Sequence, residues 1–216
     1  MNNNIVKRYV ELREKDRKVL DKRLSSELEP FLEGIKELKK SSNEYQIFRE
    51  AYIDFKGQVH DKKELFSSML PTKSVSANLE DNLYRLFLYL GMVESIGKKI
   101  VDIIILLLVA NGYDFRIRRR QIVTMNELDN EEEYISIGTK LDFLRRKGLC
   151  KVASVIDIDF RNNIAHLNFQ IKNGSVDING KNALATALIN LEKLTAAVDI
   201  INNLLIKLDA EIDLTS

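Results

Sequence analysis

The chain has 216 residues, 45% hydrophobic and 30% charged, which is long enough to bury a substantial core. Its 33 basic and 32 acidic residues balance, so no global charge attracts it to nucleic acid or a membrane. One cysteine excludes a disulfide framework and a Cys-based zinc site, and with only two histidines we expect no metal and no cofactor. Two prolines and nine glycines are too few for a β-sandwich or a barrel.

Neither a targeting signal nor a membrane span is evident in the sequence. The N-terminus is too charged for a signal peptide. The most apolar run, residues 100–110, contains Asp102 and is shorter than the ~20 apolar residues that cross a bilayer. We therefore expect a buried core helix at 100–110, and a cytoplasmic protein without a membrane partner.

Residues 1–75 are expected to form an N-terminal extension of charged helices. Leucine and valine recur there at three- and four-residue steps. Pro30 is expected in the first turn of a second helix, where proline is tolerated. A third helix, rich in aromatic residues, is expected to stop near Gly57. Pro71 marks a break before the main domain at 76–216.

One long helix is predicted at about 78–110, where it is ended by an Asn-Gly pair that favours helix termination. Its second half is apolar on nearly every face, so it should be the central helix of the core. Glu94 and Asp102 interrupt this helix eight residues apart, on neighbouring faces. Two interpretations stay open: these carboxylates face solvent or pair with Lys98 and Lys99, or they line a polar strip near a functional site.

The segments that follow predict shorter elements. An acidic stretch at 126–133 indicates a loop or a short helix, and hydrophobic spacing predicts helices over 135–146 and 151–164. A long amphipathic helix is predicted over 181–208, and it could contribute to a dimer interface as well as to the core. The expected fold class is all-α.

A small β-hairpin is expected at about 168–179, because hydrophobic and polar residues alternate on both sides of Asn173-Gly174. In the register of a two-residue turn, Ile171 lies opposite Val176. Phe169 then lies opposite Ile178, and all four side chains share one face.

Two basic clusters lie outside this hairpin. Each is interpreted either as a solvated turn or as a contact for RNA phosphates beside a cleft. Their members are Arg116, Arg118, Arg119 and Arg120 in the first cluster, and Arg145, Arg146 and Lys147 in the second.

The stretch from Asp159 to His166 holds the one constellation with recognisable chemistry. Arg161 precedes His166 by five residues, and Asn162 lies one helical turn before that histidine. A guanidinium suits a phosphate, and an imidazole can accept and return a proton near neutral pH. Together they could cleave a phosphodiester without a metal, although spacing alone also fits a structural role. His60 has no comparable companion and is expected on the surface.

The segment Arg161-Asn162-Asn163-Ile164-Ala165-His166 resembles the R-x4-6-H motif of the HEPN superfamily, in the frequent form with Asn after the arginine and Ala before the histidine. HEPN domains are helical bundles in which a long early helix carries polar residues in an apolar run, as Glu94 and Asp102 do here. A helix resembling 138–148 often precedes the motif, and a long helix closes the domain. The resemblance covers about residues 76–216.

This resemblance implies a metal-independent endoribonuclease that works as a homodimer, with the two motifs facing each other and a 2′,3′-cyclic phosphate as product. His166 would be the acid or base, Arg161 the phosphate clamp and Asn162 its support, with Glu94, Asp102 and Asp159 as supporting polar residues. Family members serve as toxins, abortive-infection factors and CRISPR-associated nucleases, so RNA and an antitoxin or defence-system protein are the implied partners.

One position departs from the family pattern. Asn168 stands where antitoxin-paired toxins often carry a tyrosine, which puts control by tyrosine modification in doubt. The alternative to an enzyme is a non-catalytic helical module that binds a protein or a nucleotide, with the N-terminal extension as a docking arm.

Overall fold

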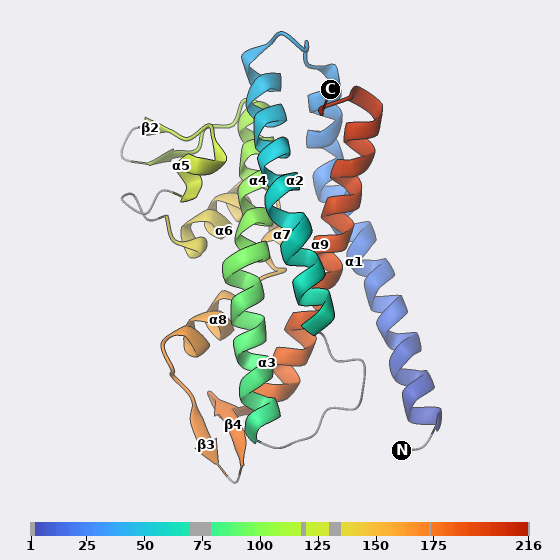
Figure 1. Cartoon of the computed structure of the whole chain (residues 1–216), viewed down its shortest axis with the longest axis vertical. Helices are drawn as coiled ribbons and strands as arrows, with labels where there is room; N and C mark the ends of the chain where they lie inside the picture. The colour runs from blue at the N-terminus through green and yellow to red at the C-terminus, as the bar shows by residue number, and fades with distance from the viewer. Residues whose placement is uncertain (1–2, 70–78, 118–119, 130–134, 173, 216) are drawn as a thin grey trace.

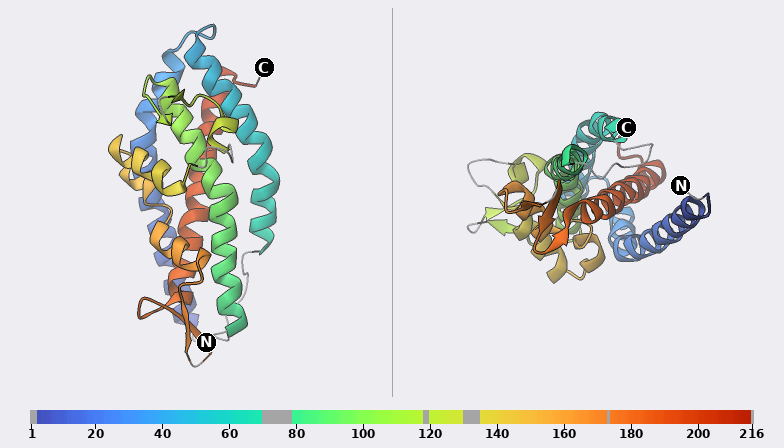
Figure 2. Two further views of the ribbon diagram at one scale, coloured as in Figure 1. Left: turned by 90° about the vertical axis from the view of Figure 1, so that its left-hand side faces the viewer. Right: turned by 90° about the horizontal axis from the view of Figure 1, so that it is seen from below.

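The computed structural model describes residues 3–69, 79–117, 120–129, 135–172 and 174–215. Four long helical runs lie side by side along the long axis, and the short elements between α4 (Lys98–Ala110) and α9 (Ala183–Ile212) line one side of them (Figures 1 and 2). The predicted all-α class is confirmed in its coarse form: the chain is mostly helical with little strand. Within these residues, no helix is long and apolar enough to cross a membrane.

The first helix, α1 (Asn3–Glu37), contains Pro30 in its interior, so the predicted boundary there is wrong. A proline inside a helix removes one hydrogen bond and costs ~3 kcal/mol. Here the loss falls on the exposed side of the helix, whereas Leu28, Leu32 and Ile35 are buried on both sides of it. Burial of that face therefore keeps the helix continuous.

Helix α2 (Asn43–Met69) also runs past its predicted end at Gly57. Gly57 is exposed and has open space around its Cα, while Phe55 and Val59 are buried on either side of it. Helix α1 packs against α9 and α2 packs against α4, so both contribute to the same hydrophobic core as the later helices. The predicted domain boundary near residue 75 lies outside the described residues.

The predicted long helix is present as three consecutive elements, α3 (Leu79–Met92), a π-helical segment η1 (Val93–Gly97) and α4 (Lys98–Ala110). Every residue of α4 after Lys98 is buried, which confirms it as the central helix. The Asn111 side chain donates to the carbonyl oxygens of Leu107 and Phe31, at 2.8 and 3.0 Å, and so joins the end of α4 to α1. A Cβ on Gly34 would lie 1.9 Å from that side chain, so this approach requires glycine.

The predicted helix over 151–164 is wrong in its continuity. The chain forms α7 (Cys150–Ala153) and α8 (Ile158–Ala165) instead. The break follows from Asp157, whose carboxylate accepts the Phe160 N–H at 3.0 Å and so starts a new helix. Helices α5 (Met125–Asp129) and α6 (Ile137–Arg146) agree with two shorter predictions, although residues 130–134 lie outside the described part.

The hairpin is present, with β3 (Gln170–Lys172) antiparallel to β4 (Ser175–Ile178) and Ile171 opposite Val176 as predicted. Residues directly opposite each other in an antiparallel pair share a face, so Ile171 and Val176 lie on one side as predicted, but only part of that face is buried. Val176 is fully buried and Ile171 is 55% exposed, because β4 packs on the helices and β3 is an edge strand. Ile178 pairs with Lys181 of an unpredicted third strand, β5 (Lys181–Asn182). Asn173 lies outside the described residues.

Two further features complete the fold. A second small sheet, which the sequence pattern did not predict, pairs β1 (Arg116–Ile117) with β2 (Arg120–Gln121). The predicted last helix is present as α9 (Ala183–Ile212), and ion pairs join it to α1 near its middle, between Arg17 and Asp199, and near its end, between Lys36 and Glu211.

Candidate functional site

The site begins at the π-helical segment of the central helix. A π turn inserts one extra residue and is frequent at functional sites. Here it contains Glu94, and the Ser95 hydroxyl donates back to the Gly91 carbonyl at 2.6 Å. At Gly97 a Cβ would lie 3.3 Å from Ile156, so the missing side chain lets the segment before α8 approach closely.

Helix α8, which carries the Arg-His motif, is held at its start by α3 and α9. The Tyr89 hydroxyl accepts the Asp157 N–H at 3.1 Å and donates to the Asp157 carbonyl at 3.2 Å. The Asn190 amide donates to the Asp157 carboxylate at 3.4 Å, and the Tyr89 ring packs on Phe160 with centroids 5.5 Å apart. Burial raises the pKa of Tyr89 well above its usual value, so its hydroxyl keeps its proton.

Helix α1 also supports this region through one carboxylate. Glu27 accepts the backbone N–H groups of Lys151 and Val152, at 2.8 and 3.0 Å. These are free donors at the start of α7, and a carboxylate there satisfies them. The expected N-terminal extension therefore contacts the segment that leads into the motif helix.

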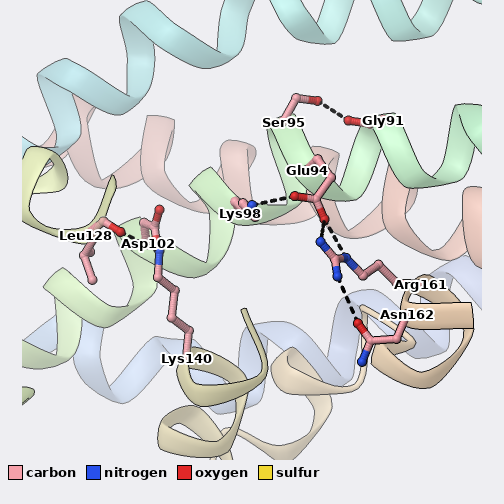
Figure 3. Close-up of polar contacts among 9 residues, drawn as sticks. All are labelled: Gly91, Glu94, Ser95, Lys98, Asp102, Leu128, Lys140, Arg161 and Asn162. Carbon is pink, nitrogen blue, oxygen red and sulfur yellow. Dashed lines mark hydrogen bonds and ion pairs between the residues drawn. The ribbon is translucent and has the colours of Figure 1, made fainter. Parts of the chain in front are cut away.

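Arg161 projects from α8 onto the π-helical segment (Figure 3). Its Nε donates to Glu94 Oε1 at 2.6 Å, its Nη2 pairs with the same oxygen, and its Nη1 donates to Asn162 Oδ1 at 2.9 Å. The other carboxylate oxygen of Glu94 pairs with Lys98 at 2.5 Å. The structure thus brings together three predicted site residues, Arg161, Asn162 and Glu94, and the predicted Glu94–Lys98 pair is also present.

Glu94 is ionised in this arrangement. Burial on its own raises the pKa of the carboxyl group, but the hydrogen bonds and charges of Lys98 and Arg161 outweigh burial and hold the pKa below its usual value. The arginine side chain is 14% exposed and the glutamate side chain 31% exposed. A solvent-borne anion can therefore reach the edge of this ion pair.

His166 ends α8 on the exposed surface. Its backbone N–H donates to the Asn162 carbonyl at 3.0 Å, and the next residue, Leu167, has a left-handed φ of 55° that terminates the helix. Among the described residues, no hydrogen bond or ion pair joins the imidazole to Arg161 or Asn162. The imidazole therefore stands one helical turn after Asn162 and is open to an incoming partner or substrate.

The two other predicted carboxylates lie apart from this cluster. Asp102 is fully buried two turns along the helix, where it pairs with Lys140 of α6 at 2.7 Å (Figure 3). Lys140 also donates to the Leu128 carbonyl at 3.0 Å. Burial raises the pKa of Asp102 against the attraction of Lys140 and Lys99. Asp159 is exposed in the first turn of α8, where a carboxylate favours the helix N-terminus.

The basic clusters are largely engaged with their own neighbours. Arg116 pairs with Asp114 at 2.9 Å, Arg120 with Glu127 at 2.5 Å, and Arg145 with Asp142 at 2.6 Å. The first cluster flanks α5, far from α8 along the molecule (Figure 1). The remaining members divide as follows: Lys147 lies over the Tyr113 and Phe143 rings, Arg146 is exposed, and Arg118 and Arg119 lie outside the described residues.

Sequence reasoning missed the residues that position the motif helix, namely Tyr89, Asp157, Asn190 and Glu27. Of these, only Asp157 could have been found from the local sequence, because aspartate is a preferred N-cap residue and a helical pattern begins directly after it. Across the described ranges, there is no group of three or more His, Cys, Asp or Glu side chains that could hold a metal ion. The side chain of His60 is outside the described part.

Comparison with known proteins adds no assignment: no protein-family model, curated protein or solved structure matches this chain.

Proposed function

We propose that the chain is a metal-independent endoribonuclease of HEPN type that acts as a homodimer in the cytoplasm, in a toxin or antiviral-defence role. The observation that carries this proposal is the contact of Arg161 with Glu94 in the π-helical segment, directly beside the helix that ends at the exposed His166. That contact joins the motif arginine to a polar residue of the central helix across 67 positions of sequence.

In the proposed reaction a ribose 2′-hydroxyl attacks the adjacent phosphorus and the bond to the 5′-oxygen of the next nucleotide breaks. One imidazole removes the hydroxyl proton, and an imidazolium protonates the leaving oxygen, which leaves a 2′,3′-cyclic phosphate end. Arg161 stabilises the charge on the phosphate oxygens. Glu94 and Asn162 fix the direction of the guanidinium, so they are positioning residues.

A second copy of the chain would supply the second proton-transfer group, because each chain offers one motif histidine. The surface around His166 supports such an arrangement. Leu167 is 64% exposed directly beside the histidine, and Ile171 on the edge strand is also exposed. Exposed apolar side chains beside a polar site are typical of an interaction surface.

One observation favours the alternative, a non-catalytic helical module that binds a protein or a nucleotide. The guanidinium of Arg161 already has acceptors in Glu94 and Asn162, so the motif arginine can also be explained as a structural link between α8 and the central helix. A ligand phosphate must compete with Glu94 for the same donors.

The deciding experiment measures cleavage of single-stranded and structured RNA with EDTA present. The natural chain is compared with His166→Ala and Arg161→Ala, and with His60→Ala as the matched control. We expect both motif variants to lose cleavage at least about 100-fold and the control to be unaffected. Activity that survives both motif changes contradicts the proposal.

Dimer formation is tested separately by analytical ultracentrifugation. Leu167→Glu places a charge on the exposed surface beside His166, so we expect it to yield monomers that fold normally and do not cleave RNA. A natural chain that stays monomeric at micromolar concentration and is inactive favours the binding module.

A further inference from the structure

Arg85 on α3 is a buried arginine whose charge has no counter-ion among the residues that the structure describes. The residue is 6% exposed, and its Nε and Nη1 atoms are buried without a hydrogen-bond acceptor. No described carboxylate lies within ion-pair distance of its guanidinium. It contrasts with Arg161 and Lys140, two enclosed cations that pair with Glu94 and Asp102 of the central helix.

The neighbouring segments do not supply the missing charge, and Glu80 and Asp81 in the first turn of α3 form no ion pair with Arg85 among the described contacts. The nine residues that precede α3, 70–78, include no aspartate or glutamate, and the first part of α9, 183–191, carries no charged residue. On β4, which also packs against α3, the Asp177 carboxylate accepts the Gly180 N–H at 2.8 Å. A buried guanidinium without a partner is strongly unfavourable, so an anion from outside the chain is the natural complement.

The surroundings of Arg85 indicate which anion. Its Cζ lies 5.6 Å from the centre of the Tyr84 ring, and that ring is 42% exposed, so the guanidinium lies just beneath a surface aromatic side chain. Phe87 follows one turn later with 46% exposure. A guanidinium fork suits phosphate oxygens, and exposed aromatic rings stack on nucleobases.

We propose that Arg85 binds a phosphate group of a nucleotide or an RNA strand, with Tyr84 and Phe87 as the surface on which the adjoining bases stack. Arg85 and Glu94 are nine residues apart on the same helical run, so they lie on opposite sides and about 13 Å apart along the axis. The phosphate at Arg85 is therefore a different one from the phosphate at Arg161. The inference does not depend on RNA cleavage.

Binding is measured with the full chain carrying His166→Ala, which prevents any turnover. The probes are a fluorescein-labelled single-stranded oligoribonucleotide followed by anisotropy, and 5′-AMP and inorganic phosphate followed by calorimetry. We expect Arg85→Met to weaken binding of the oligonucleotide or of 5′-AMP at least about ten-fold. For the oligonucleotide, the slope of log affinity against log salt should fall by about one. The matched control, Arg17→Met, removes an arginine from the surface of α1 and should change neither value.

Comparing the oligonucleotide with 5′-AMP shows whether the bound phosphate belongs to an RNA strand or to a free nucleotide. Tight binding of the oligonucleotide with weak binding of 5′-AMP identifies a strand, and equal binding of both identifies a free nucleotide. Tyr84→Leu should weaken both of these probes and leave inorganic phosphate unchanged. Since Arg85→Met replaces an uncompensated charge with an apolar chain, the ligand-free variant should melt at the same temperature as the natural chain or higher.

Two results would overturn the inference. One is unchanged binding of all three probes to Arg85→Met. The other is a lowered melting temperature in that variant, combined with full binding by Arg85→Lys, because a structural arginine would behave in that way. Neither result bears on cleavage, which is measured in the chain with natural His166.

Discussion

The central helix carries two acid–base pairs that differ in burial and in access. Asp102 and Lys140 are both essentially buried and in contact with each other, and Lys140 also donates to a backbone carbonyl. Glu94, in the π turn, and Arg161, in the helix that ends at His166, are partly exposed. The first pair is sealed in the core and the second can meet a ligand. A polar residue inside an apolar run can therefore be either a buried ion-pair partner or part of an accessible site, and its exposure to solvent distinguishes the two.

The largest expected effect concerns the sealed pair. Lys140→Met should lower the free energy of unfolding by about 3–5 kcal/mol, because it leaves Asp102 buried without its counter-ion. Urea denaturation followed by circular dichroism measures the change. The double variant Asp102→Leu with Lys140→Met should recover most of the loss, and Lys147→Met at the other end of α6 is the control. A loss below 1 kcal/mol in the single variant would show that this pair is not sealed.

For the accessible pair, Glu94 and Arg161, we expect a large effect on RNA cleavage and a small effect on stability. Glu94→Ala frees the guanidinium of Arg161, so RNA cleavage should fall about 10- to 100-fold through misplacement of the clamp. Its effect on stability should stay below about 1 kcal/mol, because the pair is partly exposed. Steady-state cleavage rates and thermal melts on the same samples test both halves. Equal losses of stability in Glu94→Ala and Lys140→Met would remove the distinction between the pairs.

The third prediction concerns the attachment of the motif helix. Asp157→Ala removes the N-cap of α8 and should cost about 1 kcal/mol of stability. Asp157→Asn, which can still accept the Phe160 N–H, should retain most of that stability. His166→Ala at the exposed end of the same helix should cost almost none. Differential scanning calorimetry of the three variants checks this order, and an unstable His166→Ala would indicate a structural histidine.

The smallest expected effect is on the pH dependence of stability, which should have opposite signs for Glu94 and Asp102. Glu94 has a folded pKa below its usual 4.5, so the unfolded chain binds more protons there and the contribution of Glu94 to stability is lost as pH falls through the folded pKa. Asp102 has a folded pKa above its usual 3.8, so its contribution falls as pH rises through that raised pKa. Unfolding of Glu94→Gln and Asp102→Asn, each compared with the natural chain between pH 3 and 7, should show opposite trends.

Local patterns predicted most of the elements. The apolar run at 100–110, the hydrophobic spacing of the last helix and the alternation of the hairpin strands each depend on residues close in sequence, and the helices and the strand pairing are present in the fold. Pro30 was misread because its helix is held by burial against other helices, which no local rule contains.

The sequence predicted which residues belong to the candidate site but not how they contact one another. Arg161, Asn162 and Glu94 were chosen from sequence, but the contact between Arg161 and Glu94 spans 67 positions. The partner of Asp102 was missed for the same reason, since Lys140 comes from another helix and looks like any lysine of an amphipathic surface. The unpaired charge of Arg85 is likewise visible only once burial is known.

The pairing of α1 with α9 has a consequence for synthesis of the chain on the ribosome. Arg17 and Asp199, which join these helices, are separated by 182 positions, so the apolar faces of α1 and α3 stay uncovered until α9 has been made. Contacts of such long range form late and leave a nascent chain open to aggregation. A chain stalled before α9 should therefore be a substrate for chaperones, and completion of the last helix is the step that commits it to the native bundle.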